Sequence, residues 1–578
     1  MFFAKVCECV LVLLRIEFAF GLVGAPLYGE LELAGVGPPK VCAPIGCAES
    51  LKEDCLRSNQ RLVPGLKADK FAKELFELTC ADAKLDRMSY PVPVADCDLD
   101  AVRAHPRFAV DQGVKPDGTR KIRAVDNMSW SAIEGGHQRM SKKRLREGSI
   151  NGHCAAQESV KHDHVDDLAA AMVEFIKWMK QLPALWKADI DSAFRRIPLR
   201  PDHRWASAIA FLYLGQVIMS MHTACPFGAS SSVHAWERVG ALLCTLARRV
   251  LNLAVFRYVD DFFGLEREET MDHAMHCFAR MVRVLMGATA IANRKLECGR
   301  TLCVLGVDLC LSVKGYTCRP AKEKAGKCIA AIKEALECGQ LSVGCAEKLA
   351  GRLSWACQYL FHRLGRAMLR PIFRHKFSRS GRVDCTEGLR VALTWWDWVL
   401  NQDIVEERAW NAPEGDCVYL FVDASGGSVK KGVPPRCAAV LYVDGFWHYT
   451  DGVPAKKIMA CLQPRGDNQI TSLETMVISI GLATFAEELR GRKVLVFSDN
   501  TGAEAAAKRG SAHAWDHCEM VHGIWTQAFL NQTHVWIVRV PSDDNLSDLP
   551  SREKYKLVHE LEAVWRPPLI AKLFAECE

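Results

Sequence analysis

The 578-residue sequence contains no low-complexity tract and no internal repeat, and it has no long uninterrupted apolar run. A membrane-spanning helix needs about 20 mostly apolar residues, but Lys5, Glu8, Arg15 and Glu17 interrupt the apolar N-terminus. The 25 cysteines are scattered without a repeated CxxC pair, which argues against a disulfide framework. We therefore expect a soluble protein with reduced thiols in the cytoplasm or nucleus, without membrane contact.

Neither sign of charge is in large excess, because the sequence has 74 basic and 68 acidic residues and a net charge of +6. That balance alone does not indicate a nucleic-acid partner. Residues 361–382, however, contain basic side chains and no acid, whereas a solvated helix face normally mixes both signs. Four of them recur at spacings of three and four residues and predict one helix face, which Pro371 would interrupt: Arg363, Arg366, Arg370 and Arg374. A second basic cluster lies at 139–146.

The pattern of apolar periodicity and turn residues divides the chain into segments of different character. Strand-like and helix-like runs alternate in the first half, a helical stretch follows, and four strand-like runs come after an Asn-Ala-Pro-Glu-Gly boundary at 411–415. We expect five segments: 1–104, of unknown role; 105–318, of mixed α and β structure; 319–411, helical; 412–556, α/β with a mixed sheet; and 557–578, a tail.

Two adjacent acids, Asp260 and Asp261, lie between short apolar runs in FRYVDDFFGL. This pattern predicts a β-hairpin whose turn exposes both carboxylates. The strand-like run ending at Asp189 could bring a third acid within reach of them. Clustered carboxylates repel one another unless a cation neutralises them, and their hard oxygens suit Mg²⁺. The alternative for an isolated Asp-Asp pair is an ordinary solvated turn.

These acids belong to a series of motifs that resembles the reverse transcriptases. YVDD at 258–261 resembles their signature, and DIDSAF at 189–194 followed by Ile-Pro-Leu resembles their first palm motif. CPFG at 225–228, Lys295 in ANRKLECG and VLGVDL at 304–309 resemble three further palm motifs. KPDGTRKIRAVDN at 115–127 resembles the fingers segment that holds the triphosphate. Six motifs in the order of the family are mutually consistent.

The resemblance implies a role for each matching residue. Asp189, Asp260 and Asp261 would be catalytic metal ligands for two Mg²⁺ ions, for which Mn²⁺ could substitute. Phe194 would exclude a 2′-hydroxyl, or would otherwise be a plain core aromatic. Either Arg120 or Arg123 would bind the triphosphate. Lys295 would either neutralise the pyrophosphate or be an ordinary solvated lysine. The residues that would contact the deoxynucleoside triphosphate are Arg120, Arg123, Phe227, Gly228 and Lys295.

A second series of acids follows later in the chain. Asp423 and Asp499 close the strand-like runs VYLFVDAS and KVLVFSDN, Glu474 lies in an amphipathic helix, and Asp548 lies in DNLSDLPSR. Acids at strand ends gather at the carboxyl edge of an α/β fold. Their order and spacing, with Asn545 shortly before the last acid, resemble ribonuclease H, whose four carboxylates hold two Mg²⁺ ions. The loop histidine found in many ribonucleases H is absent from VPSDDNLSD.

Two histidine-containing runs have simpler readings than a metal site. His513, His517, Cys518 and His522 cannot all face one point on a helix, so packing or solvent is favoured over zinc. The run His162-Asp163-His164, with Asp166 and Asp167, is interpreted as a solvated face.

Together the resemblances imply a right-hand α+β polymerase with fingers, palm and helical thumb, followed by an α/β ribonuclease H-like domain. The expected activities are RNA-directed DNA synthesis and cleavage of RNA in RNA/DNA hybrids, with an RNA template and a DNA primer as partners and the four arginines of 363–374 gripping the backbone. The segments GRLSWACQYLFHRLGRAMLR at 351–370 and NLSDLPSR at 545–552 are similar to those of retroelements of DIRS type or of other non-viral elements. The alternative is a domesticated or decayed element that binds nucleic acid without catalysis.

Overall fold

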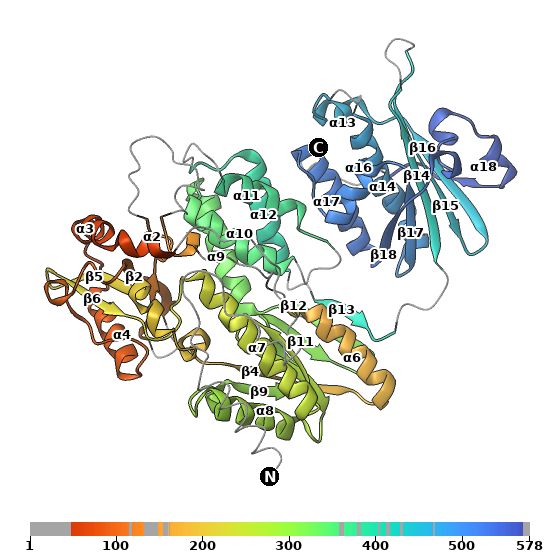
Figure 1. Ribbon diagram of the computed structural model, residues 1–578. Coiled ribbons are helices and arrows are strands. Elements are labelled where there is room, and N and C mark those ends of the chain that lie inside the picture. The colour runs from red at the N-terminus through yellow and green to blue at the C-terminus, as the bar shows by residue number, and fades with distance from the viewer. Residues whose placement is uncertain are drawn as a thin grey trace. The chain divides into compact units, whose positions relative to one another are not determined.

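The computed structural model of the chain forms two compact units, Met1–Leu305 and Gly306–Glu578 (Figure 1). The structure describes residues 48–114, 118–131, 148–153, 160, 162–357, 363–377, 383–402, 405–411, 417–427, 432–465 and 469–569. The basic cluster at 139–146 lies outside these residues. Among the described residues, no helix combines the length and apolar content needed to cross a bilayer.

The first unit contains a five-stranded sheet in the order β1-β6-β5-β2-β3. Its strands are β1 (Val92–Pro93), β2 (Ala104–Val114), β3 (Arg120–Asp126), β5 (Ala208–Tyr213) and β6 (Gln216–Met221). β2 and β3 pair antiparallel with a register shift between Asp111 and Val114. This hairpin carries the KIRAVD run on β3, where alternate side chains point to opposite faces.

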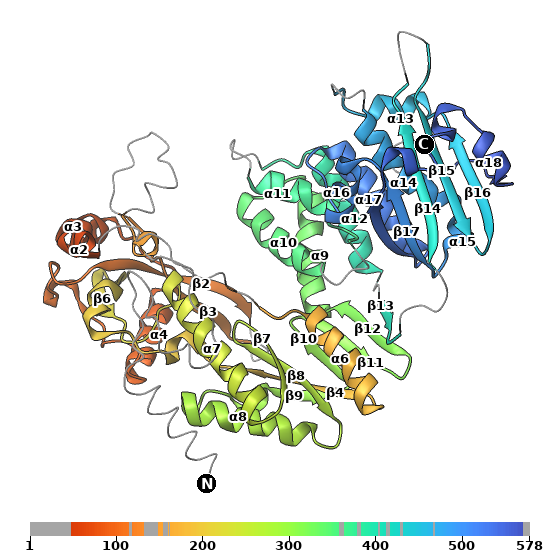
Figure 2. The same cartoon turned by 45° about the vertical axis from the view of Figure 1, so that its right-hand side comes forward.

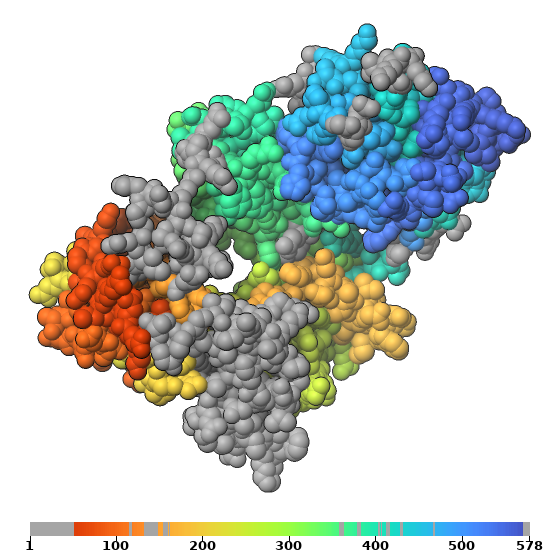
Figure 3. Space-filling model, turned by 45° about the horizontal axis from the view of Figure 1, so that its top comes forward, coloured from red at the N-terminus to blue at the C-terminus, as the bar shows by residue number. Residues whose placement is uncertain are grey.

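The N-terminal helices pack against this sheet and are not a separate extension. They are α2 (Ala48–Glu53), α3 (Cys55–Gly65) and α4 (Ala72–Lys84). Asn59 of α3 donates to the carbonyls of Leu99 and Val102 and accepts from the Ala104 amide. The surface of these helices, red and orange in Figure 3, adjoins that of the later strands of the unit, in yellow. The boundary expected at 104/105 therefore falls inside β2.

The second sheet of this unit has the order β7-β8-β4-β9. It contains β4 (Pro183–Asp189), β7 (Ala254–Tyr258), β8 (Asp261–Arg267) and β9 (Leu296–Gly299), and a short strand β10 (Thr301–Val304) follows. Three helices accompany it: α6 (Val165–Met179), α7 (Ser230–Val250) and α8 (Met271–Met286). Trp186 of β4, Phe262 of β8 and Phe278 of α8 are fully buried together, which fixes the sheet against its helices. The hairpin expected around Asp260 and Asp261 is confirmed.

The second unit begins with a small antiparallel sheet and a helical group. The strands are β11 (Val307–Leu311), β12 (Gly315–Pro320) and β13 (Glu406–Ala409), so the boundary expected at 318/319 falls inside β12. The helices are α9 (Lys322–Cys338), α10 (Val343–Ala356), α11 (Arg370–Lys376) and α12 (Glu387–Asn401). Their buried residues form one apolar core around Leu353, Leu393 and Trp396.

The rest of this unit is a six-stranded mixed sheet in the order β18-β17-β14-β15-β16-β19. Its strands are β14 (Val418–Ser425), β15 (Arg436–Val443), β16 (Phe446–Gly452), β17 (Lys493–Ser498), β18 (His534–Arg539) and β19 (Val564–Trp565). The four longer strand-like runs expected from the sequence are all strands. β19 was expected to be tail, but it pairs parallel with β16 and completes the sheet.

Helices cover both faces of this sheet (Figure 2). α14 (Ile470–Thr484), α16 (Thr501–Arg509) and α17 (Trp515–Leu530) share an apolar core with one face, through alternate residues such as Leu420 and Val422. α18 (Lys556–Glu560) lies on the other face, where Val558 packs with Val440. Two shorter helices complete the unit, α13 (Lys456–Cys461) and α15 (Ala486–Leu489). α14 is buried on nearly all sides, more than the single stripe expected.

Candidate active sites

The first candidate site lies where β4 ends beside the turn between β7 and β8. The Cα positions of Asp189 and Asp261 are direct cross-strand partners, and the Ile190 amide donates to the Asp260 carbonyl at 3.2 Å. Asp260 occupies the two-residue turn together with Val259. The structure therefore brings the three acids expected from the sequence to one sheet edge.

Lys295 is directed at the same carboxylates. Its Nζ lies 2.6 Å from Oδ2 of Asp189 and 3.8 Å from Oδ1 of Asp191. Burial raises the pKa of Asp260, and the negative charge of Asp189 adds to this, while Lys295 and Arg123 oppose it. A carboxyl group held among other acids in this way is favourable to a cation. The hard oxygens of Asp189, Asp260 and Asp261 fit Mg²⁺.

The turn itself has an unusual backbone. Val259 has φ +54°, a region that a β-branched residue rarely occupies because its side chain crowds the backbone. The Val259 carbonyl accepts hydrogen bonds from Trp236 Nε1 at 2.7 Å and from Arg257 Nη1 at 3.1 Å. These two donors fix the peptide next to Asp260, and strain of this kind is typical of functional sites.

Arg257 is buried and reaches its position because a neighbouring residue has no side chain. It forms an ion pair with Glu237 at 2.7 Å. A Cβ at Gly240 would lie 2.8 Å from Arg257 Cδ, so glycine is required there for the guanidinium to pass. These three residues support the turn from behind. They were not found from the sequence, because a lone Arg, Glu and Gly carry no motif.

The interpretation of residues 162–164 as a solvated face is wrong for the first two. The ring of His162 lies 4.8 Å from that of Tyr258, and its Nδ1 lies 3.7 Å from Glu237. A carboxylate oxygen of Asp163 accepts from the Arg257 amide at 2.9 Å. Strand β7 is open on this side, since it is an edge strand, and the segment before α6 satisfies its backbone. Asp166 and Asp167 remain exposed in the first turn of α6.

The aromatic residues expected near the nucleotide do meet. Phe194 lies in the 3-10 helix Ala193–Arg196, and its ring packs edge-on against Phe227 at 5.4 Å. Arg123 lies over the Phe227 ring at 5.1 Å. Arg120 points elsewhere and pairs with Asp111 at 2.6 Å. Of the two arginines, only Arg123 is brought to the aromatic pair.

Gly228 lies so close to β3 that there is no room for a larger residue. Its φ is +98°, and a Cβ there would lie 2.1 Å from the carbonyl oxygen of Asp126. The Asp126 side chain is itself buried between Arg107 and His222, whose ring Nε2 lies 2.9 Å away. Arg195, next to Phe194, contacts the other nitrogen of the His222 ring. This buried polar network connects the strand of Arg123 to the elements that hold Phe194 and Gly228.

Gly228→Ala is expected to lower the stability of the first unit and to displace Phe227 relative to Arg123. The new Cβ must move the backbone of β3, because no flexible side chain can yield. Thermal unfolding by circular dichroism measures this. Gly215→Ala is the matched control, since Gly215 also has positive φ (+78°) but has nothing within 4 Å. An equal loss for both variants would show that backbone strain alone, and not the contact with Asp126, makes glycine necessary.

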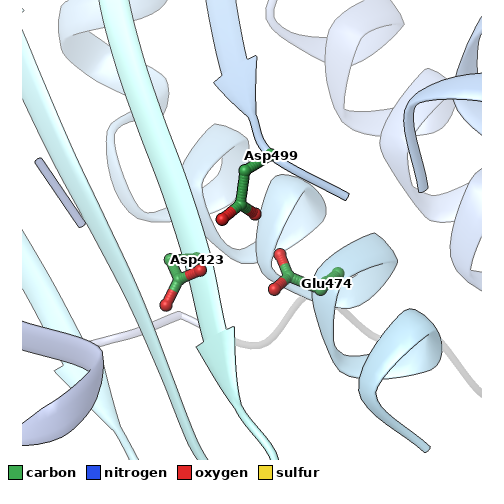
Figure 4. Close-up of side chains that lie close together, drawn as sticks. All are labelled: Asp423, Glu474 and Asp499. Atoms are coloured by element: carbon green, nitrogen blue, oxygen red, sulfur yellow. The ribbon is translucent and has the colours of Figure 1, made fainter. Parts of the chain in front are cut away.

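The second candidate site is formed by Asp423, Glu474 and Asp499, whose ligand oxygens all lie within 4.8 Å of one another (Figure 4). β14 and β17 are parallel neighbours, so the acids at their carboxyl ends meet at one edge of the sheet. Glu474 reaches them from α14. Figure 4 shows the three carboxylates turned toward one another.

The electrostatics of this cluster favour a bound cation. Burial raises the pKa of Asp423 to about 6, and the charges of Asp499 and Asp548 add to this. Burial, followed by the repulsion from Asp423 and Asp499, raises the pKa of Glu474 to about 9. Glu474 Oε2 is buried and has no hydrogen-bond partner. An orphaned acceptor among carboxylates fits a divalent metal ion with oxygen ligands.

The fourth expected acid is close to the cluster but is engaged elsewhere. Asp548 raises the pKa of Asp423, yet it pairs with Arg552 at 2.6 Å and is not one of the three clustered ligands. Asn545 is buried and donates to the Val422 carbonyl at 2.9 Å, which holds the loop beside Asp423. Ser542 donates to Asp499 at 2.6 Å, a contact that the sequence did not reveal.

The histidines and the cysteine at 513–522 each have other contacts, and His513 precedes α17. His517 contacts Ser472, Cys518 Sγ donates to the Ala512 carbonyl, and His522 packs against Trp395. Burial lowers the pKa of His522 to about 4. Among the described residues, Asp423, Glu474 and Asp499 are the acids whose ligand oxygens all lie within 4.8 Å of one another, whereas the carboxylates of Asp189, Asp260 and Asp261 do not all lie that close together.

The described part of the basic run, residues 363–377, does not form one continuous helix. Arg363 and Arg366 lie in a turn before the 3-10 helix Ala367–Leu369, and Pro371 stands in the first turn of α11. Arg370 donates to the Ala512 carbonyl at 3.0 Å and Arg374 to the His513 carbonyl at 3.2 Å. The prediction of one shared helix face is therefore wrong. A new helix begins at Arg370 with Pro371 in its first turn, and the guanidinium groups of Arg370 and Arg374 donate to backbone carbonyls just before α17. Their binding to nucleic acid stays a prediction.

Comparisons with known proteins give weak similarities. No protein-family model and no curated protein matches the sequence. A foamy viral protease-reverse transcriptase solved with double-stranded DNA is 13% identical, with a TM-score of 0.38 and coverage of 93% of each chain. The dRH form of that protein with double-stranded DNA is 12% identical, with a TM-score of 0.37 and coverage of 88% of this chain and 84% of the other. Its complex with an RNA/DNA hybrid gives 12% identity, a TM-score of 0.36 and coverage of 90% and 66%. Function is accordingly inferred from the residues of this chain.

Proposed function

We propose that the chain is an RNA-directed DNA polymerase with a ribonuclease H activity in its second unit, as in retroelements of DIRS type or other non-viral elements. The observation that supports this most strongly is the pair of acidic sites. One places Asp260 in a strained turn beside Asp189 and Asp261, and the other gathers Asp423, Glu474 and Asp499.

In the synthesis site, the carboxylates of Asp189, Asp260 and Asp261 would hold Mg²⁺, with Mn²⁺ as a substitute. A pair of such ions about 3.5–4 Å apart activates an attacking hydroxyl and stabilises the leaving oxygen. Arg123 would bind triphosphate oxygens through its planar fork of donors. Phe194, fixed against Phe227, would exclude the 2′-hydroxyl of a ribonucleotide.

Lys295 would change partners during the reaction. Its ion pair with Asp189 occupies the carboxylate that a divalent ion would need. On binding of the ion, the ammonium group would move toward the pyrophosphate and neutralise its charge. The RNA template, the DNA primer and deoxynucleoside triphosphates are the substrates of this proposal.

In the hydrolysis site, Asp423, Glu474, Asp499 and Asp548 would hold two Mg²⁺ ions that position water against the phosphodiester of the RNA strand. The ion pair between Arg552 and Asp548 would either break, which frees Asp548 to bind a metal ion, or persist and keep Asp548 at the edge of the site. Ser542 would orient Asp499.

The test uses the full-length chain in two assays, extension of a DNA primer on an RNA template and cleavage of the RNA in a hybrid. We expect both activities with Mg²⁺, and neither after chelation of the metal with EDTA. The Asp260→Asn/Asp423→Asn double variant is the background control. If the wild-type chain shows no more activity than this variant in both assays, the chain is a non-catalytic nucleic-acid-binding protein and the proposal is wrong.

A further inference from the structure

A buried polar cluster in the second unit contributes no group to either candidate site. Its centre is the Asp451 carboxylate near the end of β16, whose side chain is 8% exposed. This carboxylate accepts hydrogen bonds from the Tyr555 hydroxyl at 2.8 Å and from Trp565 Nε1 at 3.1 Å. Arg436, at the start of β15, donates to the same carboxylate and also to Glu553. The cluster therefore joins two strands to residues that come much later in the chain.

These bonds attach the segment that follows the loop of Asp548 to the sheet. Glu553 comes directly after the 3-10 helix Pro550–Arg552. Between the two ends of the segment, Val558 of α18 packs on Val440 of β15, so that α18 lies beside the strands (Figure 2). Residues 553–565 are therefore held at both ends and in the middle.

Ser551 connects this segment to the acids of the hydrolysis site, and it is fully buried. Its carbonyl accepts from Ser425 Oγ at 2.8 Å, and Ser425 is the cross-strand partner of Arg436. The Ser551 hydroxyl donates to the Asp548 carbonyl at 3.0 Å. Burial raises the pKa of Asp423, and a hydrogen bond with the Ser551 side chain opposes that rise. One buried serine therefore contacts both the strand of Asp423 and the backbone of Asp548.

The loop that carries Asp548 is thus held on both sides of the acid. Before the acid, Asn545 donates to the Val422 carbonyl. After the acid, Ser551 and the cluster around Asp451 hold the chain. The Asp548 carboxylate itself pairs with Arg552, whose side chain is 57% exposed, and such an exposed pair is a weak restraint. The position of Asp548 relative to Asp423 therefore depends on the two backbone anchors.

We propose that Arg436, Asp451 and Tyr555 are positioning residues, which hold Asp548 beside Asp423 so that both carboxylates can bind divalent ions. This inference rests on the proposed hydrolysis site. The three side chains act through the backbone at 551–553 and need no contact with the ion or with the RNA strand. Removal of groups that orient metal ligands typically lowers metal affinity or activity by roughly 10–100-fold.

The test measures Mn²⁺ binding by electron paramagnetic resonance, in the full-length chain carrying Asp260→Asn so that the synthesis site contributes little. Added Asp423→Asn should abolish the binding that belongs to the hydrolysis site. Tyr555→Phe removes the hydroxyl and keeps the ring that packs near Tyr449, and it should weaken this binding roughly tenfold. Tyr442→Phe is the matched control and should bind Mn²⁺ like the parent, since Tyr442 lies on β15 against Trp447 and outside the cluster.

A second measurement uses cleavage of hybrid RNA by the chain with an intact synthesis site. Tyr555→Phe should need a roughly tenfold higher Mg²⁺ concentration for half-maximal cleavage, and saturating Mg²⁺ should restore most of the wild-type rate. Primer extension should be unchanged. Arg436→Lys, which loses the planar fork of donors, should shift the Mg²⁺ dependence in the same direction and replaces Tyr555→Phe if that variant does not fold.

A lower melting temperature with unchanged Mn²⁺ affinity and Mg²⁺ dependence would show that the cluster only stabilises the fold, and it would overturn the proposal. Mn²⁺ binding that does not depend on Asp423 would also overturn it, because the cluster would then have no metal site to position. If Mn²⁺ binds as expected but the wild-type chain cleaves no hybrid, the proposed hydrolysis is wrong and the positioning role is supported.

Discussion

Asp260→Asn is expected to reduce template-dependent primer extension by about 10³-fold or more, while cleavage of hybrid RNA by the second unit is unchanged. The substitution keeps the shape of the side chain and removes the negative charge that would hold Mg²⁺ between the primer end and the triphosphate. Burial raises the pKa of Asp260, so the fold already favours an uncharged group at this position. Loss of activity would then report on the metal and not on unfolding.

The control for this variant is Asp202→Asn in the same unit. Asp202 is exposed in the 3-10 helix Pro201–Ser207 and pairs with Arg200, and the variant should extend primers at the wild-type rate. Extension rates are measured with a labelled primer under single-turnover conditions, and unfolding temperatures are compared for the three proteins. Wild-type extension by Asp260→Asn would remove the synthesis site from the proposal.

The parts predicted best from the sequence are those that local pattern determines. The hairpin around Asp260 follows from two apolar β-prone runs separated by two turn residues. The strands ending near Asp423 and Asp499 follow from short apolar runs closed by an acid. Parallel pairing of β14 and β17 then brings these acids to one edge of the sheet. The spacing of the acids in the sequence was therefore sufficient to predict that they form a cluster.

The parts that were missed depend on contacts between distant residues. Strand β19 is only Val564–Trp565, too short for any periodicity, and exists because β16 offers an edge. The Arg257–Glu237 pair depends on the missing side chain of Gly240, a fact visible only in three dimensions. Arg370 and Arg374 have helical spacing, but the backbone carbonyls of Ala512 and His513 accept their hydrogen bonds. Spacing predicts a helix face and not what that face contacts.

Glu474→Gln is expected to abolish cleavage of hybrid RNA, by about 10³-fold or more, and at the same time to stabilise the metal-free second unit at high pH. The pKa of Glu474 is raised from 4.5 to about 9, and that of Asp423 from 3.8 to about 6, by burial and mutual repulsion. The folded chain therefore binds these protons more tightly than the unfolded chain does. The free energy of unfolding of the metal-free protein should fall as the pH rises from about 4 to about 9.

Mg²⁺ binds the deprotonated carboxylates and should restore stability, with a larger increase in melting temperature near pH 9 than near pH 5. In Glu474→Gln most of this pH dependence should disappear, because a neutral amide replaces the carboxyl group with the largest shift. Primer extension should be unaffected, and Glu487→Gln, an exposed acid on α15, should behave like the wild type in every measurement. A metal-free Glu474→Gln protein that melts below the wild type near pH 9 would mean that this carboxylate stabilises the fold through contacts of its own, and the interpretation of the cluster as a metal site would fail.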